Sequence, residues 1–112
     1  MQATLWIYPV QDIDAALAFF CGTLGLQLKF RDADRYAAIE SGCLHLGLVA
    51  GSERIVDRPL PVFRVESMAS ELQRLLAAGA RILRPLERGP HEQRVILQSA
   101  DGIGLMLTAA LD

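Results

Sequence analysis

The chain has 112 residues, of which 52% are apolar, and its 11 basic and 13 acidic residues leave a net charge of −2 at pH 7. A chain of this length and apolar content is expected to fold as one small domain, residues 1–112, and not to be disordered. The scattered, nearly balanced charges exclude a basic surface for nucleic acid or an anionic membrane, and no apolar run has membrane-spanning length.

The first half of the chain predicts the element order βαβββ. Residues 3–10 are rich in β-branched and aromatic side chains and predict a strand. Asp12 or Asp14 can cap a following helix, and Gly25 can end it in a left-handed conformation. The apolar stripe of that helix would consist of Ile13, Leu17, Phe20 and Leu24. Three more strands are expected over residues 26–30, 35–41 and 43–50.

The second half predicts the same order after a polar linker at residues 51–59. A strand over residues 61–65 precedes a helix capped by Ser67 and ended by Gly79. The apolar stripe of this helix would consist of Met68, Leu72, Leu75 and Leu76. A short strand (81–83), a loop (85–91) and two strands joined at an Asp-Gly turn (92–99 and 103–108) complete the half.

The two halves align at a constant offset of 55 residues. Ile13 then matches Met68, and Leu17 matches Leu72, so the apolar stripes of both helices coincide. We therefore interpret the chain as two βαβββ modules, residues 1–50 and 60–112, although two unrelated amphipathic units could match this well by chance.

The first strand–helix junction, "PVQDIDAALAFFCGTLGL", and the Asp101-Gly102 turn resemble the vicinal oxygen chelate superfamily, which includes glyoxalase I, bleomycin-resistance proteins and extradiol dioxygenases. The resemblance covers essentially the whole chain. It implies an α+β fold in which two βαβββ modules form a curled mixed-sheet cup, with one face of each sheet on its helix and the other lining the cup. Members of this size usually build or complete their cups between two chains, so a homodimer is expected.

Metal-using members of this superfamily place ligands on the first and last strands of each module, usually His or Glu. On this chain those positions fall on Leu5, Leu60 and Met106, with the fourth on or near His45. Leucine offers no donor and a thioether suits only soft metals, so we expect no metal, no other cofactor and no catalytic residues. Cys43 and His45 could supply two zinc ligands, but no third is nearby; buried thiols are the favoured interpretation of Cys43 and Cys21.

We expect the cup to be lined by alternating strand residues that share a face. These candidate ligand-binding residues are Leu5, Ile7, Tyr36, His45, Leu60, Val62, Arg64 and Met106. Arg64 could hold an anionic ligand, pair with Glu40, or be an ordinary surface arginine. Trp6, Tyr8 and Phe63 would then pack against the helices; a register shifted by one would instead make them an aromatic clamp.

The function that the resemblance implies is metal-free binding of a small hydrophobic or aromatic molecule, as in drug-sequestering antibiotic-resistance proteins. One alternative is a metal-dependent glyoxalase- or dioxygenase-like enzyme. Another is a dimeric member whose cup is filled by its own side chains. The N-terminal sequence carries no signal-peptide pattern and two cysteines make no disulfide framework, so a cytoplasmic protein is expected, with no nucleic-acid or membrane partner.

Overall fold

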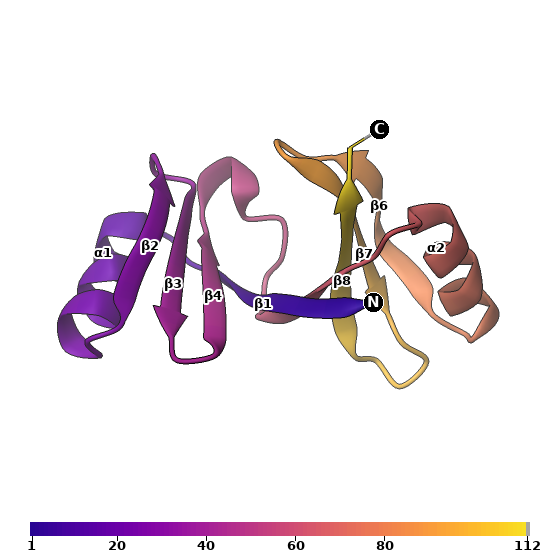
Figure 1. Cartoon of the computed structure of the whole chain (residues 1–112), viewed down its shortest axis with the longest axis horizontal. Helices are drawn as coiled ribbons and strands as arrows, with labels where there is room; N and C mark the ends of the chain where they lie inside the picture. Colours follow the sequence, from indigo (N-terminus) through magenta and orange to yellow (C-terminus); the bar gives the residue numbers. More distant parts are fainter. Residues whose placement is uncertain (112) are drawn as a thin grey trace. The chain divides into compact units, whose positions relative to one another are not determined.

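The computed structural model describes residues 1–111 and has the expected α+β element order, βαβββ twice (Figure 1). The first module contains β1 (Gln2–Pro9), α1 (Ile13–Leu17), the π-helical η1 (Ala18–Thr23), β2 (Gln27–Asp32), β3 (Tyr36–Ser41) and β4 (Leu44–Val49). A single 3₁₀ turn, η2 (Gly51–Glu53), follows it. The second module contains β5 (Leu60–Arg64), α2 (Met68–Ala77), β6 (Arg81–Arg88), β7 (Glu92–Gln98) and β8 (Gly104–Ala110).

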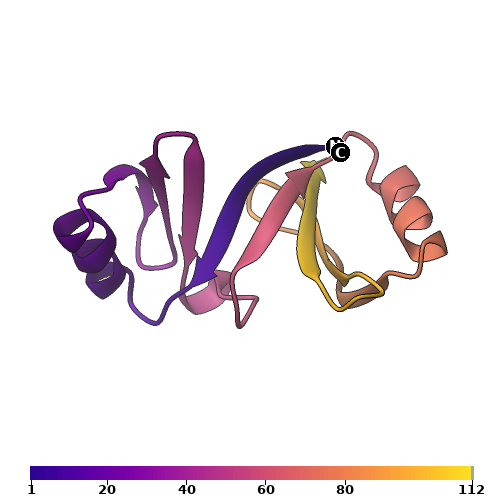
Figure 2. The same cartoon turned by 90° about the horizontal axis from the view of Figure 1, so that it is seen from below.

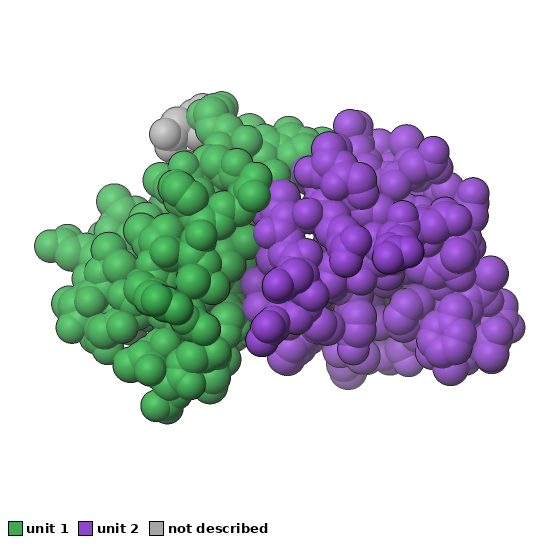
Figure 3. Space-filling view, turned by 180° about the vertical axis from the view of Figure 1, so that it is seen from behind, with its two compact units in different colours: residues 1–4, 61–112 green, residues 5–60 purple. Residues whose placement is uncertain are grey.

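The strands form a mixed eight-stranded sheet in the hydrogen-bonding order β2-β3-β4-β1-β5-β8-β7-β6. The chain divides into two compact units (Figure 3): unit 1 contains residues 1–4 and the chain from residue 61 onward, and unit 2 contains residues 5–60. Strand β1 therefore gives its first residues to unit 1 and the remainder to unit 2.

In unit 2, α1 covers one face of the strands (Figure 2). Strands β1 and β4 pair in parallel, and β3 pairs antiparallel with both β2 and β4. The core between helix and strands consists of Ile13, Ala37, Ile39, Leu46, Leu48 and Ala50. The Asp12 carboxylate accepts a hydrogen bond from the Asp14 amide at 3.0 Å, so Asp12 is the N-cap of α1.

In unit 1, α2 covers one face of β5, β7 and β8 in the same manner. Strands β5 and β8 pair in parallel, and β7 pairs antiparallel with β6 and β8. The core consists of Val65, Met68, Val95, Leu97, Leu107 and Ala109. Met68 is buried at the first position of α2, as Ile13 is in α1, so the two residues that the offset of 55 aligns occupy equivalent places in their helices.

The first predicted apolar stripe is wrong at its end. The Leu24 amide donates to the carbonyl of Phe19, five residues back, at 2.9 Å, because the helix continues as the π-helical η1. A π turn contains more residues than an α turn, so Leu24 rotates away from the line of Ile13, Leu17 and Phe20 and stays 51% exposed. Leu76 in α2 is likewise exposed and not part of the core stripe.

The predicted loop over residues 85–91 is wrong in its first part, since β6 continues to Arg88 and only residues 89–91 connect it to β7. Pro85 can be accommodated because β6 is an edge strand of the sheet, where a missing amide donor leaves no ladder bond unmade. The pairing with β7 shifts register between Arg84 and Glu87, which brings the Glu87 carboxylate 2.6 Å from Arg84 Nε.

The cysteines are not buried as expected. Cys43 is exposed in the turn before β4, and Cys21 in η1 is partly buried against the unit 2 core. Among the described residues, no helix has the length and apolar character that crossing a bilayer requires.

Candidate ligand-binding site

A pocket of about 130 Å³ opens on unit 2, on the strand face opposite α1. Side chains from four strands line it, because alternate residues of each strand point to this face. Leu5 comes from β1, Tyr36, Ala38 and Glu40 from β3, and His45 from β4. Lys29 joins them from β2, where the pairing with β3 shifts register between Leu28 and Phe30.

The apolar end of the pocket depends on a glycine. Gly47 pairs with Ile7 of β1 and with Ala38 of β3. A Cβ at position 47 would stand 2.9 Å from both Leu5 Cδ1 and the Tyr36 hydroxyl oxygen. The two side chains can therefore close over the strand only because residue 47 has no side chain.

The other end of the pocket is polar. Glu40 and His45 lie directly opposite each other on β3 and β4, with His45 Nδ1 3.5 Å from Glu40 Oε1. Lys29 Nζ lies 3.5 Å from Glu40 Oε2. These distances and the partial exposure of all three side chains make the contacts weak electrostatic pairs, so an incoming polar group can compete for them.

The structure brings three of the predicted residues together in this pocket: Leu5, Tyr36 and His45. Ile7 lies on the same face, because it pairs with Gly47. Its side chain is buried. The same register puts Trp6 and Tyr8 opposite Leu46 and Leu48, on the α1 side.

Two of the three aromatic side chains, Tyr8 and Phe63, pack as the helix-facing prediction requires, whereas Trp6 is 44% exposed. The ring of Tyr8 packs edge-on against Phe20, with centroids 6.0 Å apart, and Phe63 packs on the unit 1 core. The alternative aromatic clamp is therefore not formed by these side chains.

The other predicted residues do not line this pocket. Leu60, at the end of unit 2, is buried. In unit 1, Val62 pairs with Met106 across β5 and β8, and both are buried. Arg64 is exposed and pairs with Thr108 in the register of β5 and β8. Glu40 interacts with Lys29 and His45 instead of with Arg64.

Sequence reasoning missed Lys29 and Ala38 as lining residues. The strand bulge that admits Lys29 leaves no signal in the alternation of apolar and polar residues. Ala38 could have been found, because it is two residues from both Tyr36 and Glu40 on one strand and so shares their face.

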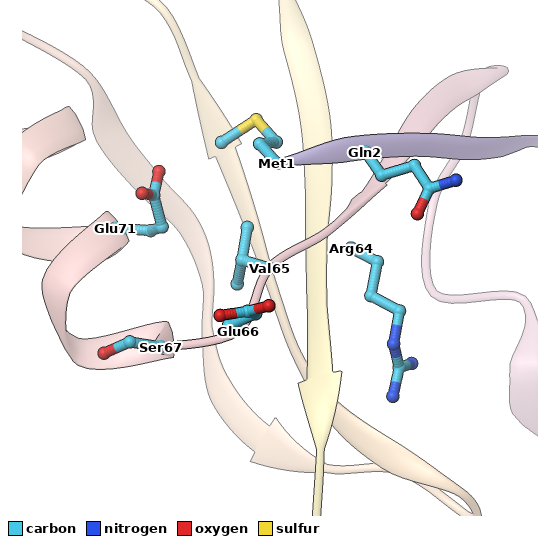
Figure 4. A pocket seen from close by; sticks show the side chains of 7 residues that line it. All are labelled: Met1, Gln2, Arg64, Val65, Glu66, Ser67 and Glu71. Atoms are coloured by element: carbon cyan, nitrogen blue, oxygen red, sulfur yellow. The ribbon is translucent and has the colours of Figure 1, made fainter.

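A second pocket, of about 520 Å³, lies on unit 1 at the start of α2 (Figure 4). The Arg64 side chain extends away from Glu66 and Glu71 in this view. Glu71 accepts a hydrogen bond from Arg74 at 2.5 Å, which lowers the pKa of Glu71, and Ser67 Oγ accepts one from the Ser70 amide. This pocket is dominated by exposed charges of both signs, whereas the smaller pocket of unit 2 combines an apolar and a polar end.

The sequence profile of the Glyoxalase/Bleomycin resistance protein/Dioxygenase superfamily matches residues 4–107. The chain belongs to this superfamily. An uncharacterized protein of Mycolicibacterium smegmatis is 28% identical to it over 98% of this chain and 95% of its own length.

Two solved structures resemble this superfamily member in fold. A Legionella pneumophila chain described as an NAD-dependent benzaldehyde dehydrogenase has a TM-score of 0.77 at 19% identity, covering 96% of this chain and 98% of its own. A superfamily member from Vibrio splendidus 12B01 has a TM-score of 0.71 at 15% identity, covering 98% and 100%. At these identities the likeness concerns the fold alone.

At the four positions where the family resemblance predicts metal ligands, the residues of this superfamily member do not fit a divalent metal. Leu5 and Leu60 offer no donor, Met106 offers a buried thioether, and only His45 offers a nitrogen. Within residues 1–111, no three His, Cys, Asp or Glu side chains come together in a group that could hold a metal ion.

Proposed function

We propose that this protein binds a small hydrophobic or aromatic molecule without a metal and sequesters it. The observation that carries the proposal is the pocket of unit 2, in which Leu5 and Ala38 supply apolar surface and Glu40 and His45 supply polar groups. Small-molecule sites typically combine an apolar lining with a few polar groups that fix orientation.

The donor chemistry supports a metal-free mechanism. A catalytic metal needs about three protein ligands and one open position. The superfamily positions of this chain supply one imidazole, and Cys43 adds a thiol that lies outside the pocket lining. Binding would therefore rest on burial of apolar ligand surface, at roughly 25 cal/mol per Å², together with hydrogen bonds at the polar end. Sequestration of a drug, and so antibiotic resistance, is one biological role that such binding could serve.

We also propose that the protein acts as a homodimer. The edge strand β6 carries three large apolar side chains that are 43–50% exposed, namely Ile82, Leu83 and Leu86. An edge strand with exposed apolar side chains is a typical site for pairing with another chain. A second copy of the chain is the partner that would cover them.

A ligand screen tests the binding proposal. Purified protein is titrated with a panel of small aromatic, aliphatic and charged compounds, with the thermal midpoint and calorimetric binding as readouts. The variant Ala38→Leu fills the pocket and should raise Kd for any hit at least about tenfold. The control Ala69→Leu adds the same volume at an exposed position of α2 and should leave Kd unchanged.

Two results would contradict the proposal. If no compound binds, or if Ala38→Leu binds every hit as the wild type does, the pocket is not the site and the alternative of a self-filled cavity is favoured. If hits are recovered chemically altered after incubation, as judged by mass spectrometry, the protein is an enzyme and not a sequestering binder.

A further inference from the structure

We propose that the ligand of the unit 2 pocket is a single aromatic ring that carries an uncharged hydrogen-bond donor, such as a phenol hydroxyl or an aromatic amine. This inference rests on the proposed binding function and narrows it to one ligand class. It follows from the size of the pocket and from the charges at its polar end.

The size of the pocket selects one ring. Its volume of about 130 Å³ is below the roughly 150 Å³ of an enclosed apolar cavity that holds one benzene molecule, so this pocket, which is open to solvent, can bury about one ring at most. The close approach of Leu5 and Tyr36 over Gly47 leaves no room to deepen the apolar end, because a Cβ there would already stand 2.9 Å from both side chains. A second fused ring would therefore have to project into solvent and gain little buried area.

The polar end selects an uncharged donor. Glu40 is a carboxylate, which accepts hydrogen bonds and repels an anionic ligand group. Lys29, 3.5 Å from Glu40, compensates that charge, so a cationic ligand group gains little either. His45 directs Nδ1 toward Glu40, which leaves its Nε2 atom as the other imidazole group for a ligand hydroxyl or amine.

The test compares four probes that differ in one property at a time. Phenol, toluene, benzoate and 2-naphthol are titrated into isotopically labelled full-length protein, and amide shifts at residues 36, 38 and 45 are followed by NMR. Phenol should have a Kd at least about fivefold below those of toluene, benzoate and 2-naphthol. The variant Glu40→Leu removes the acceptor, which glutamine would keep, and should remove most of the preference for phenol over toluene. Toluene should bind this variant at least as tightly as the wild type, which shows that the variant is folded. The control Glu66→Leu, at an exposed carboxylate of unit 1, should keep the preference.

Each contrary result overturns the inference in a recognisable way. If toluene or 2-naphthol binds as tightly as phenol, the affinity depends only on the apolar area that the ligand buries. If benzoate binds more tightly than phenol, the pocket is an anion site. Both results overturn the inference and leave the proposed binding function standing. If none of the four probes shifts these signals, the ligand class is wrong, and the broader panel described above then decides whether the proposed function itself fails.

Discussion

Leu5 of β1 lies against the backbone of Gly47 in β4, so closely that its Cδ1 atom is 2.9 Å from the place where a Cβ would be. We expect Gly47→Ala to destabilise the protein by roughly 1 kcal/mol, at the low end of the cost of overpacking, because the new methyl group must displace the far ends of the half-buried Leu5 and Tyr36 side chains. The free energy of unfolding in urea measures this effect.

The matched control is Gly22→Ala in η1, where a Cβ would meet nothing within 4 Å. That variant should be as stable as the wild type or more stable by up to about 1 kcal/mol, since alanine restricts the unfolded chain. Equal stability of the two variants would show that the close approach at Gly47 does not constrain the fold.

The ion-pair cluster on unit 1 predicts an acid-dependent part of the stability. The hydrogen bond from Arg84, then its charge and that of Arg94, lower the pKa of Glu87. A carboxyl group whose folded pKa is depressed stabilises the fold above its unfolded pKa, about 4.3, and this contribution disappears as the pH falls through the lower folded value. Between pH 6 and pH 3, the free energy of unfolding of the Glu87→Gln variant should therefore fall less than that of the wild type. The two decreases should differ by about 1 kcal/mol or less.

Chemical denaturation at a series of pH values checks this difference. Arg84→Gln removes the largest cause of the shift and should flatten the same part of the curve. If the profiles of wild type and Glu87→Gln run parallel throughout, the cluster does not couple protonation to folding.

Metal removal is expected to have no effect. Protein purified without chelator should contain zinc, nickel, manganese and iron far below one equivalent per chain, and EDTA should leave its thermal midpoint unchanged. The reason is that Leu5, Leu60 and Met106 cannot replace the usual nitrogen and oxygen donors. Inductively coupled plasma mass spectrometry measures the metal content per chain. The metal-free proposal would be refuted if the wild type held nearly one equivalent of metal and the double variant Cys43→Ser/His45→Gln lost it.

The dimer proposal predicts a solution mass of twice 12.3 kDa by light scattering after size-exclusion chromatography. Leu83→Lys places a charge among the exposed apolar side chains of β6 and should shift the mass toward that of one chain. Ile103→Lys, at a 61% exposed position outside β6, is the control and should not. A wild-type protein that is monomeric at high concentration would contradict the proposal.

Some details of the fold could not have been predicted from local patterns. The π-helical turn that exposes Leu24 and the extension of β6 through Pro85 both run against ordinary preferences. Helical periodicity assumes an α turn throughout, and proline is acceptable in β6 only because the strand is at the edge of the sheet. Edge position is a property of the assembled sheet and is not written in any short stretch of sequence.

The order of elements was determined by the sequence alone, because helix caps such as Asp12, apolar stripes and turn glycines act within a few residues of one another. The sequence also determined which residues share a face of a strand. Alternation puts Leu5 on the same face as Ile7, and Tyr36 on the same face as Glu40, whichever strands lie next to them. Only the tertiary structure decided which of these faces share a pocket. Parallel pairing of β1 with β4 and the bulge in β2 bring Leu5, Lys29 and His45 together from distant parts of the chain, and such pairing depends on the packing of the whole unit, not on any local pattern.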